Sequence, residues 1–241
     1  MENKLKIAIQ NNNDLYEAVF SQWDIPYQSN DEIWYSFEEV PPLYSNLVTR
    51  SPEWRPDATF TKIDNASNAR KQDWSIKDSF AVLDLSQHGF ARLFEAKWIY
   101  LQLSDFRPHS ITHPLIYKII GNEEELSAWR LAWDADEHLG INIFSHRLLN
   151  HPRVKFIAGY RKEKIISGCM INDSNSILGI SNFYSPAREL TYWSDMLGFI
   201  FSSFEHKEII GYERYDLVNQ LETIGFRSLG NLAVWIKTRY R

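Results

Sequence analysis

Apolar and polar residues alternate in the last third of the chain in a pattern that predicts a hairpin followed by strands and helices. Segments 154–160 and 165–171 carry apolar residues at alternate positions, which is typical of half-buried strands, and the charged turn between them predicts a β-hairpin. We expect a strand, an amphipathic helix, a short strand, a second helix and a closing strand to follow, at 176–184, 190–204, 208–212, 216–224 and 232–238. This order predicts an α/β (α+β) fold, in which a mixed, twisted sheet is flanked by helices.

Capping residues mark where the helices of this half begin and end. Asn122 followed by Glu125 has the spacing of a capping box, directly after a strand expected at 115–120. Asp216 is expected to cap the last helix, because a short side-chain oxygen there can accept a hydrogen bond from the first turn. Gly225 is expected to end the same helix, since glycine adopts the left-handed conformation that helix ends require.

The first half of the chain has a weaker periodicity. A helix is expected at 14–23 with Asp14 as its N-cap, and a largely irregular region at 41–70, which is rich in Pro, Asn, Ser and Thr. Segment 75–85 is apolar enough for a strand, and a helix is the alternative there. Further extended segments and a proline-containing connection between the halves are expected at 33–40, 97–103 and 104–114.

The chain is expected to divide into an N-terminal lobe, 1–110, and a C-terminal lobe, 111–241. Gly89-Phe90 and Gly225-Phe226 each precede an aromatic strand near the end of a half. This short internal repeat supports the hypothesis that the first lobe is a diverged, partial copy of the second.

Composition excludes several classes of protein. The net charge of −5 and the absence of a run of Lys or Arg argue against a nucleic-acid partner. Cys169 is the only cysteine of the 241 residues, so no intrachain disulfide is possible and a cytoplasmic location is expected; its apolar segment predicts a small buried side chain. No apolar stretch approaches the roughly 20 residues of a membrane helix, and the first ten residues do not resemble a signal peptide. His109 and His113 are bracketed by prolines, so no metal site is expected.

The order of elements in the second half resembles that of the GCN5-related N-acetyltransferase (GNAT) superfamily, over about 115–237. Gly225-Phe226 matches the Gly-Phe that ends the last helix of that family, and 177–184 matches its central strand. The resemblance implies that acetyl-CoA, or another acyl-CoA, binds along this strand. Backbone amides would pair there with the pantetheine arm, at Gly179, Ile180, Ser181 and Asn182.

The chain departs from the family pattern where the family holds the cofactor's pyrophosphate. GNAT enzymes place a glycine-rich turn at the start of the next helix, and its amides cradle phosphate. Here the turn contains Arg188, which occupies the place of a basic family residue, but no glycine follows and Glu189 adds negative charge. Arg188 is either a phosphate ligand or a solvated residue of the helix start. Arg214 stands near the position of an Asn that often contacts the cofactor.

The position of the family's proton donor is also altered. GNAT enzymes often use a Tyr a few residues before the Gly-Phe pair to protonate the departing thiolate, and that register falls on Leu221. Tyr212 and Tyr215 are the candidate replacements, and Glu213 is the candidate base that deprotonates an incoming ammonium. The alternative for all three is an ordinary surface or packing role.

Two functions follow from these observations. The first is an N-acetyltransferase-like enzyme that moves an acyl group from acyl-CoA to a small-molecule or peptide amine. The second is a noncatalytic relative that binds a ligand or a protein. The unusual turn and Leu221 favour the second, whereas the order of elements suits both.

Overall fold

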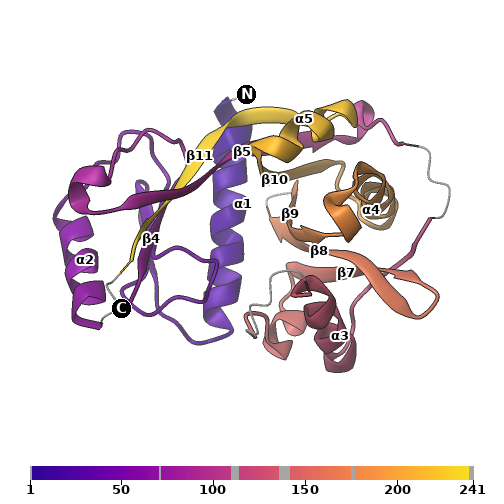
Figure 1. Cartoon of the computed structure of the whole chain (residues 1–241), viewed down its shortest axis with the longest axis horizontal. Coiled ribbons are helices and arrows are strands. Elements are labelled where there is room, and N and C mark those ends of the chain that lie inside the picture. Colours follow the sequence, from indigo (N-terminus) through magenta and orange to yellow (C-terminus); the bar gives the residue numbers. More distant parts are fainter. Residues whose placement is uncertain (1, 71, 110–113, 136–141, 175–176, 239–241) are drawn as a thin grey trace. The chain divides into compact units, whose positions relative to one another are not determined.

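The computed structural model describes residues 2–70, 72–109, 114–135, 142–174 and 177–238. The chain forms two compact units, 1–98 with 229–241 and 99–228 (Figure 1). It leaves the first unit within strand β5 (Ala91–Gln102) and returns within β11 (Arg227–Lys237). These units differ from two consecutive lobes because the last strand belongs with the N-terminal part of the chain. The shared origin of the lobes stays a prediction.

In its described residues, the first unit contains a sheet with the α-helices α1 and α2. Its strands lie in the order β1-β2-β3-β4-β11-β5, and β3 pairs with β4 in parallel while the β1–β2, β2–β3 and β4–β11 pairs are antiparallel. Its core combines aliphatic side chains with aromatic ones, among them Trp54, Trp74, Phe90 and Trp235. The elements are α1 (Glu2–Ser21), β1 (Gln28–Ser29), β2 (Ile33–Tyr35), β3 (Leu47–Thr49), α2 (Ala58–Arg70), β4 (Trp74–Asp78) and the 3₁₀ helix η1 (Ser86–His88).

Two predictions in this unit are wrong. The first helix begins at Glu2, and Asp14 lies inside it, where Asp14 Oδ1 accepts a hydrogen bond from Gln10 Nε2 at 2.6 Å. The run of buried asparagines at 11–13 interrupts the apolar pattern that would have announced this helix. The region 41–70 contains β3 and α2; the signal for α2 is Asp57, whose Oδ1 accepts from the amides of Thr59 and Phe60.

The second unit holds a mixed sheet in the order β5-β10-β9-β8-β7-β6. The β6–β7, β7–β8 and β8–β9 pairs are antiparallel, and β9 and β10 are parallel. The predicted hairpin and the predicted fold class, a mixed sheet flanked by helices, are confirmed. The elements are η2 (Leu103–Asp105), β6 (Ile116–Ile119), α3 (Glu123–Trp133), η3 (His146–Asn150), β7 (Val154–Arg161), β8 (Lys164–Ser174), β9 (Ile177–Tyr184), η4 (Pro186–Arg188), α4 (Leu190–Ser203), β10 (Glu208–Arg214) and α5 (Tyr215–Thr223).

Helices cover both faces of this sheet (Figure 1). Trp129 on α3 packs on Phe156 of β7, at 5.0 Å between ring centroids. The next residue, Ile157, lies in the opposite core with Cys169 and the apolar stripe of α4, because neighbouring residues of a strand point to opposite faces. Cys169 is fully buried, as predicted.

In the second unit, two of the three predicted helix caps are confirmed. Asn122 Oδ1 accepts from the amide of Glu125 at 2.9 Å, and Glu125 Oε2 accepts from the amide of Gly121 at 2.9 Å, so the carboxylate satisfies a backbone donor one residue before the N-cap. Gly225 follows α5 at a φ of 107°. Asp216 is not the N-cap of α5; it lies in the first turn, and Arg214 precedes the helix.

Candidate functional site

Strands β9 and β10 separate soon after they meet. Their parallel pairing covers Leu178 with Ile209 and Gly179 with Ile210, whereas β9 continues to Tyr184 and β10 to Arg214. Beyond these pairs, the described residues of the two strands form no further ladder. The end of β9 beyond Gly179 therefore forms no ladder with β10, at the carboxyl edge of the sheet where ligands approach parallel strands.

A β-bulge lies in β9 at the same place. Met170 of β8 pairs with Ser181 and Gly168 pairs with Tyr184, so three steps along β9 oppose two along β8. Asn182 has a φ of 50°, a left-handed conformation that is uncommon outside glycine. The extra residue bends β9 and redirects its backbone, which is the local cause of the gap.

Gly211 is the residue after the last ladder pair, and it keeps β10 in close contact with β9 at Ile180. A Cβ atom at this position would lie 2.7 Å from the carbonyl oxygen of Ile180. Any larger residue would therefore push β10 away from β9. The close approach and the bulge together set the point at which the gap opens.

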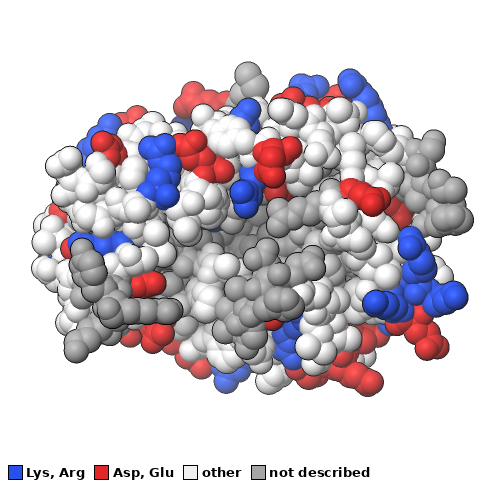
Figure 2. Space-filling view, viewed as in Figure 1, with Lys and Arg blue, Asp and Glu red and all other residues white. Residues whose placement is uncertain are grey.

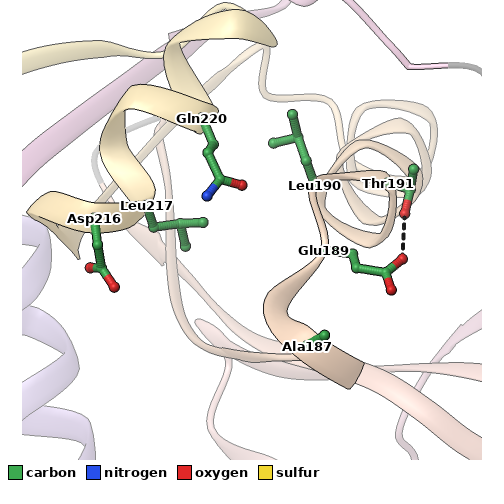
Figure 3. Close-up of a pocket in the computed structure, with 7 residues that line it drawn as sticks. All are labelled: Ala187, Glu189, Leu190, Thr191, Asp216, Leu217 and Gln220. Carbon is green, nitrogen blue, oxygen red and sulfur yellow. Dashed lines mark hydrogen bonds between the residues drawn. The ribbon is translucent and has the colours of Figure 1, made fainter.

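A pocket of about 500 Å³ lies between the starts of α4 and α5 in the same unit. In Figure 3, Leu217 and Gln220 on α5 face Leu190 on α4 across this pocket, and the turn before α4 closes it below. Its lining residues are Ala187, Glu189, Leu190, Thr191, Asp216, Leu217 and Gln220.

The pocket carries negative charge at the positive ends of both helices. Glu189 directly precedes α4, and its Oε2 accepts a hydrogen bond from Thr191 Oγ1 at 3.4 Å. Asp216 lies in the first turn of α5 and is 4.0 Å from Arg214 Nε, with both side chains largely exposed. These carboxylates already compensate the partial positive charge that an N-terminal helix end offers to an anion. On the face shown in Figure 2, acidic and basic side chains are interspersed.

The structure brings most of the predicted site residues to one edge of the sheet. Gly179 to Asn182 lie on β9, where it leaves β10. Tyr212, Glu213 and Arg214 end β10, and Tyr215 begins α5. Because β9 and β10 run in parallel, their carboxyl ends lie at the same edge. The backbone of Arg188 lies in η4 beside the pocket, and its side chain is outside the described part of the structure.

Leu221 lies in the apolar core and has no exposed surface. It therefore has a packing role, in agreement with the expectation that it cannot donate a proton. Tyr215 is 37% exposed, and Tyr212 and Glu213 are half-buried.

Several site residues were not singled out from the sequence. Ala187 has a φ of 51° in the turn before α4, and its side chain occupies the position at which a glycine would expose the backbone. Asp216 and Gln220 line the pocket from α5. Their spacing of four residues on a helix was the available signal, since i and i+4 share a face.

The two parts of an acyl-CoA donor fit this site unequally. A pantetheine arm carries amides that match unpaired strand groups, and the gap between β9 and β10 supplies such groups. A pyrophosphate needs cations or free helix-start amides, whereas the pocket offers two carboxylates and no basic lining residue in the part of the chain that the structure describes.

Within the described residues, neither a metal-binding cluster nor a membrane-spanning helix accompanies the site. In the described ranges, no cluster of three or more His, Cys, Asp or Glu side chains is arranged to hold a metal ion. Among the described helices, none combines the length and the apolar composition needed to cross a bilayer.

Comparison with solved structures identifies the fold. The chain is similar to a GCN5-related N-acetyltransferase from Kribbella flavida, with a TM-score of 0.68 and 10% identity over 96% of this chain and 95% of the other. It is also similar to a functionally unknown conserved protein from Staphylococcus epidermidis, with a TM-score of 0.64 and 10% identity over 92% and 98%. A tandem GNAT protein from the clavulanic acid biosynthesis pathway matches with a TM-score of 0.51 and 9% identity, over 81% and 75%.

The chain therefore has the GNAT fold, and the resemblance seen in its sequence is confirmed at this level. No family model matches the sequence, and no curated protein matches it. At about 10% identity the likeness establishes the architecture, and the chemistry must be argued from the residues themselves.

Proposed function

We propose that this protein is an amine N-acyltransferase that takes its acyl group from a pantetheine thioester, with acetyl-CoA as the donor to test first. The observation that carries this proposal is the gap between β9 and β10, which opens beyond the contact of Gly211 with Ile180 and lies beside the bulge of β9 near Asn182. A sheet closed along this line would have no backbone groups left for a ligand.

The residues at the edge of the sheet can support direct transfer. Glu213 accepts a proton from the substrate ammonium, directly or through one water. The free amine nitrogen forms a bond to the thioester carbon, and a β9 amide near the bulge stabilises the oxygen that becomes negatively charged. Tyr215 or Tyr212 donates a proton to sulfur as the carbon–sulfur bond breaks. Of the two protons that the ammonium loses in total, one ends on the thiol and one in solvent.

Stabilisation by acetyl-CoA tests donor binding. At about a hundred times its dissociation constant, a ligand that binds only the folded protein adds about 2.7 kcal/mol to the free energy of unfolding. A shift of the melting temperature by several degrees is expected. An unchanged melting temperature at millimolar acetyl-CoA would contradict donor binding.

Replacement of the candidate base tests turnover. Thiol release from acetyl-CoA is measured against a panel of polyamines, amino acids and lysine peptides. Glu213→Gln is expected to slow transfer by roughly a hundredfold or more, the usual contribution of a general base, without weakening donor binding. Glu222→Gln, which makes the same change at an exposed position of α5, is the matched control. Equal rates for Glu213→Gln and the unchanged protein would remove Glu213 from the mechanism.

A noncatalytic binding protein is the second candidate function. Leu221, fully buried where the family often places its proton donor, is the observation that favours it. In that case acetyl-CoA or a related pantetheine compound still stabilises the protein, and no amine in the panel releases thiol. If the unchanged protein acylates any amine and Glu213→Gln abolishes this turnover, the noncatalytic alternative is excluded.

A further inference from the structure

The backbone conformation and the charges at the start of α4 disfavour binding of the CoA diphosphate. Ala187 holds a left-handed φ of 51°, the conformation in which glycine turns expose their amides. Ala187 lines the pocket, and its methyl group occupies space beside the backbone that a glycine would leave open.

The carboxylates near the starts of α4 and α5 also disfavour binding of a diphosphate. Glu189 directly precedes α4, with its Oε2 at 3.4 Å from Thr191 Oγ1, and Asp216 lies in the first turn of α5. A diphosphate in this pocket would meet two negative side chains, and each such pair repels by about 1 kcal/mol when it is 4 Å apart in water. Arg214 offsets this repulsion little, since its contact with Asp216 is long and both side chains are exposed.

We infer that the site recognises the acyl-pantetheine part of its donor and does not hold the nucleotide diphosphate. This inference rests on the proposed function and narrows its donor class. The physiological donor would then be a pantetheine thioester whose carrier places no diphosphate between α4 and α5. The gap between β9 and β10 supplies the binding groups for the arm, and the acidic pocket selects against the nucleotide end.

Calorimetric titration of the full chain with S-acetylpantetheine, acetyl-CoA and 3′,5′-ADP tests this inference. S-acetylpantetheine and acetyl-CoA are expected to bind with dissociation constants within about threefold of each other, and 3′,5′-ADP is not expected to bind. In a site that holds the diphosphate with charge-assisted hydrogen bonds, loss of the nucleotide would weaken binding by roughly a hundredfold or more. A loss of that size would overturn the inference.

Variants of the pocket provide a second, gain-of-affinity test. Glu189→Gln and Ala187→Gly are each expected to tighten acetyl-CoA binding by about fivefold, which corresponds to about 1 kcal/mol, and to leave S-acetylpantetheine binding unchanged. Glu205→Gln is the matched control for charge, because Glu205 follows the far end of α4, about 21 Å away along a helix of 14 residues. Unchanged acetyl-CoA affinity in both pocket variants would contradict the inference.

Arg188→Ala separates the remaining outcomes. If Arg188 binds the diphosphate, Arg188→Ala lowers acetyl-CoA affinity by roughly tenfold or more, about the value of one charge-assisted contact, and S-acetylpantetheine still binds. That result overturns the inference. Equal binding of both donors by Arg188→Ala and the unchanged protein supports it. Failure of both donors to bind the unchanged protein would refute the proposed function itself.

Discussion

Lys77 should make the stability of the protein rise with pH above neutrality. This lysine of β4 is 2% exposed. Its Nζ donates to Asn12 Oδ1 at 3.0 Å and lies 4.9 Å from the centroid of the Tyr16 ring. Burial lowers the pKa of Lys77 from 10.5 to about 7, because an apolar environment disfavours the charged ammonium.

The sign and size of the effect follow from proton linkage. Between pH 7 and 10.5 the unfolded chain keeps a proton on Lys77 that the folded chain has largely lost, so the unfolded state binds more protons and stability rises with pH. The difference of 3.5 pKa units, 10.5 minus 7, limits the whole effect to about 5 kcal/mol. From pH 7 to pH 9 the expected gain is about 2 kcal/mol.

Urea unfolding at pH 7, 8 and 9 measures this gain. Lys77→Met keeps a long apolar side chain and removes the titrating group, so the unchanged protein should gain about 2 kcal/mol relative to this variant between pH 7 and 9. Lys164→Met, at an exposed position, controls for the loss of a positive charge and should retain the pH dependence. Parallel pH profiles for the unchanged protein and Lys77→Met would refute the reasoning.

Four further substitutions test the packing of the second unit. Gly211→Ala should lower the free energy of unfolding, measured in urea, by about 1–3 kcal/mol, because its Cβ would lie 2.7 Å from a backbone oxygen. Gly198→Ala in α4 is the control: its Cβ would have nothing within 4 Å, so it should raise the free energy of unfolding by about 0.5–1 kcal/mol. Gly225→Ala should be the most destabilising glycine change, with soluble yield and melting temperature as the measurements, since its Cβ would lie 2.1 Å from Asp105 O at a φ of 107°. Tyr184→Phe should raise the melting temperature, because the buried hydroxyl has no hydrogen-bond partner among the described residues and its removal ends a desolvation cost of about 1 kcal/mol. Equal stabilities for the two glycine variants at 211 and 198, a fully stable Gly225→Ala, or a loss of stability in Tyr184→Phe would each contradict the packing described here.

The second unit was predictable because its signals are local. The capping box at Asn122 and Glu125 and the hairpin of β7 and β8 each depend on residues close in the chain. The same is true of the glycine that ends α5. Hydrophobic period and turn chemistry suffice for such elements.

The helices of the first unit were harder to predict because their apolar residues do not form a clear helical period. Buried asparagines at 11–13 lie within α1, and α2 has weak amphipathicity in a region rich in loop-forming residues. Their burial is decided by tertiary packing, which routinely overrides local preference.

By itself, the sequence determined the order of elements in 99–228 and the buried thiol of Cys169, because these depend on composition and local spacing. Only the tertiary structure decided that β9 and β10 separate after two residue pairs, that the last strand joins the first unit, and that Glu189 and Asp216 line one pocket. These features join residues far apart in the chain, and their positions follow from backbone geometry and packing that no local pattern encodes.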